Sequence, residues 1–86
     1  MKILWEDRAW DDYLYWQNQD RKTLKRINAL INERRRSPYE GMGKPEPLRF
    51  GKSGLWSRRI DSANRVVYFE RDGIVYIIAC RGHYEN

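Results

Sequence analysis

The sequence predicts a single α+β domain, in which an N-terminal helical hairpin packs on a twisted antiparallel sheet. Up to about residue 36, apolar side chains recur at helical spacing, whereas from about residue 56 extended stretches alternate with turns. A segment that holds all three prolines separates these two halves. The chain of 86 residues has room for one domain.

The first half opens with a short strand and a helix. Residues Lys2 to Trp5 can form the strand. Asp7 is a candidate N-cap for a helix that runs to about Gln17. One stripe of this helix would consist of Trp10, Tyr13, Leu14 and Gln17.

A second helix is predicted from its cap residue Asp20 to about Arg36. Its apolar residues follow the i, i+3, i+4, i+7 spacing of an amphipathic helix: Leu24, Ile27, Leu30 and Ile31. Pro38 ends it, because proline disfavours helical geometry in the residue before it. The first helix is acidic and the second is basic, which predicts an antiparallel hairpin with partly complementary faces.

The second half is predicted to be a sheet. Residues 37–47 are rich in proline and glycine, and we expect no regular element there. Strands are expected over Trp56–Ile60, Arg65–Glu70 and Ile74–Arg81, with a turn at residues 71–73. The last strand is almost wholly apolar, which is typical of a central strand.

Charge indicates a polyanionic partner. The formal net charge is +5, and 12 of the 17 cationic side chains are arginines, whose planar fork binds phosphate oxygens bidentately. The alternative is a basic surface that only keeps the protein soluble. The run Arg34, Arg35 and Arg36 is interpreted as a contact to nucleic acid, or else as cations that favour the helix dipole.

Cysteine usage and hydropathy indicate a soluble cytoplasmic protein without membrane contact. One cysteine cannot form an internal disulfide, and Cys80 is expected to be a buried small apolar residue. No apolar run approaches the ~18 residues of a membrane helix, and the N-terminus lacks a signal-peptide core. With one histidine and one cysteine, no metal site or cofactor is expected.

Three residues form a candidate catalytic group for RNA cleavage. Glutamate can take the proton of a ribose 2′-OH, and histidine, partly protonated near neutrality, can protonate the departing 5′-oxygen. Glu46, set between two prolines, and His83, the only histidine, fit these roles, with Arg65 as the cation beside the phosphate. The alternatives are a salt bridge from Glu46 to Lys44 or Arg49, an exposed histidine without a role and an exposed cross-strand arginine.

Several motifs together resemble a known family. They are WDDYLYW (10–16), GKPEPL (43–48), SGLWSRRI (53–60), NRVVY (64–68) and IIACRGHY (77–84). This set is similar to the YoeB toxins, a branch of the RelE superfamily of bacterial toxin–antitoxin systems. The similarity runs from Trp5 to Tyr84 in unbroken register.

The resemblance implies a ribosome-dependent endoribonuclease that enters the A site and cuts the exposed codon of the mRNA. It implies that Glu46 is the general base, Arg65 the phosphate stabiliser and His83 the general acid, while Tyr84 shapes the site. The residues that it and the basic pattern assign to RNA binding are Lys44, Arg49, Arg58 and Arg59. Asn64 departs from the family, in which histidine is frequent, and Glu85 and Asn86 extend past the usual end.

The resemblance also implies partners. They are the 70S ribosome with its mRNA and ribosomal RNA, a YefM-type antitoxin, a second copy of the chain, and operator DNA bound only through the toxin–antitoxin complex. Two other functions stay open: a ParE-type toxin that acts on a protein target, and a non-catalytic module that binds the ribosome or RNA. A pure binder would still arrest translation after His83→Ala, with its message intact.

Overall fold

The computed structural model describes residues 2–36, 40–48 and 54–83, with the side chain of Arg35 left out of the description. Within these described residues, two helices and five strands follow one another. They are β1 (Lys2–Trp5), α1 (Asp7–Gln19), α2 (Arg21–Arg36), β2 (Glu46–Pro47), β3 (Trp56–Arg59), β4 (Arg65–Arg71) and β5 (Ile74–Ala79). The predicted α+β class is confirmed. Neither helix is long and apolar enough to cross a membrane.

The strands form one sheet in the order β1-β5-β4-β3-β2. The sheet is mixed and not antiparallel throughout, because β1 pairs in parallel with β5. The long connection through both helices allows this parallel pairing, which no tight turn could make. The other three pairings are antiparallel. With a neighbour on each side, β5 is an interior strand, as its apolar composition predicted.

Two local expectations differ from the structure. The residue at the N-cap of α1 is Glu6 and not Asp7, and its side chain makes no capping hydrogen bond. Glu46 and Pro47, within the segment expected to be irregular, pair with β3 as a two-residue strand. The cap of α2 is as predicted: Asp20 accepts hydrogen bonds from the Thr23 hydroxyl and backbone N–H, and these hydrogen bonds lower the pKa of its carboxyl.

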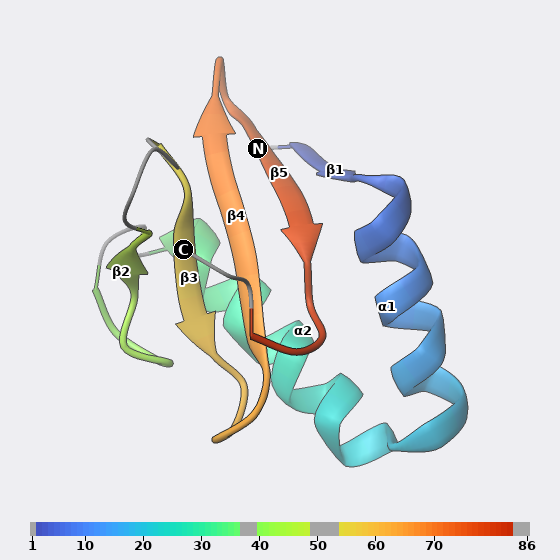
Figure 1. Ribbon diagram of the computed structural model, residues 1–86. Helices are drawn as coiled ribbons and strands as arrows, with labels where there is room; N and C mark the ends of the chain where they lie inside the picture. The colour runs from blue at the N-terminus through green and yellow to red at the C-terminus, as the bar shows by residue number, and fades with distance from the viewer. Residues whose placement is uncertain (1, 37–39, 49–53, 84–86) are drawn as a thin grey trace.

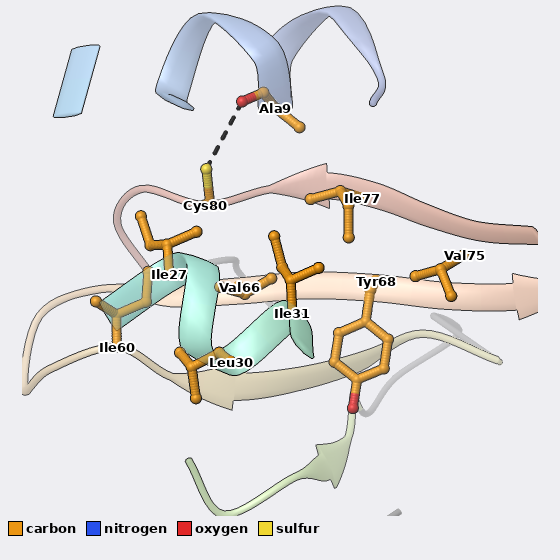
Figure 2. Close-up of a cluster of buried hydrophobic side chains, with 10 residues drawn as sticks. All are labelled: Ala9, Ile27, Leu30, Ile31, Ile60, Val66, Tyr68, Val75, Ile77 and Cys80. Carbon is orange, nitrogen blue, oxygen red and sulfur yellow. Dashed lines mark hydrogen bonds between the residues drawn. The ribbon is translucent and has the colours of Figure 1, made fainter. Parts of the chain in front are cut away.

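The core lies between α2 and the sheet. Figure 2 shows Ile27, Leu30 and Ile31 of α2 close to Val66 and Tyr68 of β4. In Figure 1, α2 lies behind β3 and β4. This confirms most of the predicted stripe of the second helix.

The buried face of α1 differs from its predicted stripe. Trp10 and Leu14 are 45% and 37% exposed, whereas Ala9 and Asp12 are buried. Tyr13 packs partly against the core, and its hydroxyl donates to Asn28 of α2 at 2.9 Å. Because α1 lies beside β5 and β1, its smallest buried residue, Ala9, allows the close approach that larger side chains would prevent.

Cys80 is fully buried beside α1, as predicted, and its Sγ lies 3.6 Å from the Ala9 carbonyl oxygen (Figure 2). Burial, with a smaller contribution from the Asp12 carboxylate, raises the pKa of Cys80 from 9.0 to about 12. The unfolded chain therefore releases the thiol proton at lower pH than the folded protein.

We expect this difference to destabilise the protein in alkali. The stability from the neutral thiol is fully present below pH 9 and is lost as the pH rises toward 12. Urea unfolding of the wild type and Cys80→Ala at pH about 8 and about 10.5 measures it, because the variant lacks only this titration. An equal loss of unfolding free energy in both proteins would contradict the expectation.

Candidate active site

Strand register places Glu46 and Arg65, two of the predicted catalytic residues, on one face of the sheet together with Arg59. Glu46 pairs with Ser57, and Arg59 pairs with Arg65. Directly paired residues project to the same side, and residues two apart along a strand share a face. Glu46, Arg59 and Arg65 therefore share the face opposite to Arg58, which lies against α2.

Glu46 and Arg65 are in direct contact. Arg65 Nη1 donates to Glu46 Oε1 at 3.2 Å. The Glu46 side chain stays 58% exposed, so this ion pair contributes little to stability and leaves the carboxylate open to a ligand. Arg65 is more enclosed, at 20%. The pairing of β2 with β3 brings Glu46 within reach of the first residue of β4.

His83 approaches the same end of β4 from another direction. After β5 the chain turns across the N-terminal end of β4 (Figure 1). There the Gly82 carbonyl accepts a hydrogen bond from the backbone N–H of Arg65 at 3.1 Å. The exposed ring of His83 places Nε2 3.2 Å from the Ser62 carbonyl oxygen. Glu46, Arg65 and His83, which come from distant parts of the chain, thus lie at the same end of β4.

The other predicted residues are exposed, lie outside the described residues, or, in the case of Arg34 and Arg58, are buried. Lys44 and Arg59 are exposed near Glu46, and the Arg59 N–H donates to the Gly43 carbonyl at 2.6 Å. Arg36 is exposed at the end of α2. Tyr84, Arg49 and the Arg35 side chain lie outside the described residues.

Within residues 2–36, 40–48 and 54–83, no three His, Cys, Asp or Glu side chains gather as metal ligands would.

Burial removes Arg58 from the exposed RNA-binding set that the sequence predicted. Arg58 is 1% exposed, and its side chain lies on the face of the sheet that α2 covers. The guanidinium donates to the Tyr68 hydroxyl at 3.2 Å and to the carbonyls of Met42 and Glu40 at 3.0 and 3.2 Å. Arg58 therefore fastens the segment before β2 to the core.

Arg34 is removed from that set for the same reason. It is 2% exposed, forms an ion pair with Glu70 of β4, and places its guanidinium 5.2 Å from the ring centre of Tyr68. Helical periodicity explains the difference within the run, because Arg34 follows Ile27, Leu30 and Ile31 on the buried face while Arg36 points outward.

Sequence reasoning missed the residues that hold the segment around His83. Asp12 and Trp16 of α1 bind the backbone of Cys80, and Asn64 binds that of Gly82. Asp61 followed by Asn64 between two strands is a turn signal, but it predicts only the turn and not the contact of Asn64 with Gly82. No local pattern in the sequence distinguishes Asp12 from Asp11 beside it, although Asp11 is exposed and Asp12 is buried.

Comparisons with known proteins agree on one family. The sequence profile of the "YoeB-like toxin of bacterial type II toxin-antitoxin system" matches residues 5–84. The toxin YoeB of Escherichia coli (strain K12) is 54% identical over 84 residues, which cover 98% of this chain and all of that protein.

Two solved structures from Staphylococcus aureus are also similar. One is a YoeB dimer, with 39% identity, 98% of each chain covered and a TM-score of 0.92. The other is a heterotetrameric YoeB–YefM toxin–antitoxin complex, with 39% identity, the same coverage and a TM-score of 0.89.

Two adjacent arginines on β3 allow the structural role of Arg58 to be measured. Arg58→Ala should lower the free energy of unfolding by about 3 kcal/mol, because it removes a buried cation and its hydrogen bonds. Arg59→Ala, the matched control on the exposed face, should change it by about 0.5 kcal/mol or less. Urea unfolding followed by circular dichroism compares them, and equal losses would refute the assignment.

Proposed function

This chain belongs to the YoeB-like toxin family of bacterial type II toxin–antitoxin systems, and on that premise we propose that it is a ribosome-dependent endoribonuclease. It cleaves mRNA in the A site without a metal ion and so stops translation in the cytoplasm. The observation that carries the proposal is the Glu46–Arg65 contact at the end of β4 where the His83 segment is fastened.

The reaction is a transesterification at one phosphate, assisted by two proton transfers. Glu46 takes the proton of the ribose 2′-OH, and the freed oxygen attacks the adjacent phosphorus. The bond from phosphorus to the 5′-oxygen breaks, and the imidazolium of His83 gives its proton to that oxygen. The products are a 2′,3′-cyclic phosphate and a 5′-hydroxyl. A glutamate–histidine pair is sufficient for both proton transfers.

Arg65 supplies the positive charge. The phosphorane gains negative charge as the 2′-oxygen attacks, and a fixed cation stabilises that state most. In the free protein the guanidinium is already oriented by Glu46 at 3.2 Å, so RNA meets the two groups side by side. Tyr84 follows His83 in the sequence, and the family relationship assigns it to shaping the same site.

The exposed cations near this site are proposed to hold RNA. Lys44 and Arg59 flank Glu46, and Arg49 follows β2 in the sequence. Arg36, with Arg35 beside it, remains the part of the helix-end run that could contact ribosomal RNA. These contacts would position the substrate, and they would weaken as salt concentration rises.

The partners are proposed from the relatives. Since a Staphylococcus aureus YoeB forms a complex with YefM, we propose a YefM-type antitoxin that neutralises this chain, with operator DNA bound only by the complex. Since a solved YoeB structure from the same species is a dimer, we propose a homodimer.

The N-terminal part of the chain offers a surface for that dimer. Trp10 and Leu14 on α1 are large apolar residues that are 45% and 37% exposed. Trp10 stacks on Tyr13 with ring centres 5.6 Å apart and meets the edge of Trp5 at 5.9 Å. Exposed apolar residues in such a cluster are typical of a protein interface.

We expect Glu46→Gln and His83→Ala each to lower the single-turnover cleavage rate on programmed ribosomes by about 10²–10⁴-fold, because each removes one proton transfer. Glu40→Gln, a matched change at an exposed glutamate of the same segment, should cleave normally. Mapping the mRNA ends should give 5′-hydroxyls, with chelator present at a concentration that leaves the ribosomes intact. A rate within about threefold of wild type would refute the assigned role, and 5′-phosphate ends would mean that water is the nucleophile.

The dimer surface has its own test. Trp10→Glu should raise the dimer dissociation constant by about tenfold or more, because it buries a charge in an apolar interface. Met42→Glu, at another apolar residue that is 40% exposed, is the control. Light scattering over a concentration series measures the monomer fraction. An unchanged dimer in Trp10→Glu would remove this surface from the proposal.

A further inference from the structure

The turn between β3 and β4 is stiffened by its own side chains. The carboxylate of Asp61 accepts hydrogen bonds from the backbone N–H groups of Ala63 and Asn64, each at 2.8 Å, and from the Asn64 side-chain NH₂ at 3.0 Å. The Asn64 carbonyl in turn accepts from the N–H of Ile60 at 2.9 Å. Because a carboxylate can only accept, the NH₂ of Asn64 must face Asp61, which fixes the direction of the amide oxygen.

That oxygen holds the segment before His83. Asn64 Oδ1 accepts the Gly82 N–H at 2.7 Å, and the Gly82 carbonyl accepts the Arg65 N–H at 3.1 Å. Both polar backbone groups of Gly82 are therefore bound by two consecutive residues, Asn64 just before β4 and Arg65 at its start. Gly82 has a φ of +80°, a conformation that glycine adopts without strain.

The same turn also determines how the imidazole is presented. His83 Nε2 lies 3.2 Å from the Ser62 carbonyl oxygen, which has no proton to give. Nε2 must therefore carry the hydrogen of this contact, and Nδ1 is the nitrogen left for a ligand. The ring is exposed, so RNA can reach Nδ1 without displacing the Ser62 contact.

We propose that Asn64 is a positioning residue for His83, and that Nδ1 is the atom that protonates the departing 5′-oxygen. This rests on the proposed function, in which His83 is the general acid. In the step itself the Nδ1–H bond breaks and an O–H bond forms as the bond from phosphorus to the 5′-oxygen breaks. The electron pair of the broken bond stays on that oxygen, and Nε2 keeps its hydrogen toward Ser62.

Asn64→Ala tests the positioning role, and Asp20→Ala is its matched control. Both remove a side chain that binds a backbone N–H at a turn or cap, but Asp20 lies at the start of α2 and binds Lys22 and Thr23. We expect Asn64→Ala to lower the single-turnover rate at saturating ribosomes by about 10–100-fold, because a small displacement of an acid is costly. Ribosome affinity should stay unchanged, and the Gly82 amide should exchange with solvent faster.

A role confined to stability would affect the two variants alike. Asp20→Ala should cleave normally although it also loses its hydrogen bonds. Equal rates in both variants, or a weakened affinity with a normal rate at saturation in Asn64→Ala, would overturn the positioning role. Unchanged Gly82 exchange in Asn64→Ala would overturn it as well.

The nitrogen assignment is tested without changing Asn64. Cys80 provides a junction at which a synthetic peptide of residues 80–86 can be ligated to residues 1–79, so that His83 carries one methyl group on either ring nitrogen. Methylation of Nδ1 should lower the rate by about 10²–10⁴-fold, because it removes the transferable proton. Methylation of Nε2 removes the Ser62 contact but keeps a proton on Nδ1, and should cost less.

A larger loss of cleavage rate on Nε2 methylation than on Nδ1 methylation, or equal losses, would overturn the Nδ1 assignment. His83 would still be the proposed acid in that case. Unchanged cleavage in both ligated proteins and in His83→Ala would refute the proposed function itself. The rate at which the Gly82 amide exchanges with solvent in Asn64→Ala reports on the Asn64–Gly82 contact whatever the cleavage result. A failure of the positioning role can therefore be told apart from a failure of the proposed function.

Discussion

The position of Cys80 is the constraint on which the rest of the candidate active site depends. Here the chain leaves an interior strand, so its backbone groups lose the sheet ladder and need other partners. α1 provides both: the Asp12 carboxylate accepts the Cys80 N–H at 3.0 Å in a buried position, and the Trp16 indole donates to the Cys80 carbonyl at 2.8 Å. This fixes the direction in which the chain turns toward Gly82 and His83.

From there, two supports hold the segment. On one side, Arg8 of α1 donates to the Arg81 carbonyl at 3.3 Å, and the Arg81 guanidinium lies 3.5 Å from the ring centre of Tyr15. On the other side, Asn64 and Arg65 bind Gly82. A segment held on both sides keeps the backbone of His83 in a fixed position although its side chain is exposed, which is the preorganisation that the proposed role of His83 needs.

Basic residues serve two physical purposes in this protein. Arg34 and Arg58 are buried between α2 and the sheet, where ion pairing, ring contact and carbonyl acceptors compensate the loss of water. Arg59 and Arg65 project to the opposite face, and alternation along β3 separates Arg58 from Arg59. The net charge therefore includes arginines that a polyanion cannot reach. Which arginines are buried and which are exposed is seen only in the folded structure.

The sequence by itself determined the α+β class, the end of α2 near Arg36, its cap at Asp20 and the apolar character of β5, because propensity, capping and periodicity act over a few neighbouring residues. It also indicated Glu46, Arg65 and His83 through their chemistry. Three features become visible only in the folded chain: the parallel pairing of β1 with β5, the faces of α2 and β3 that are covered together with their arginines, and the contact of Asn64 with the segment before the histidine. Those outcomes depend on contacts between residues far apart in the chain, and no local pattern encodes such contacts.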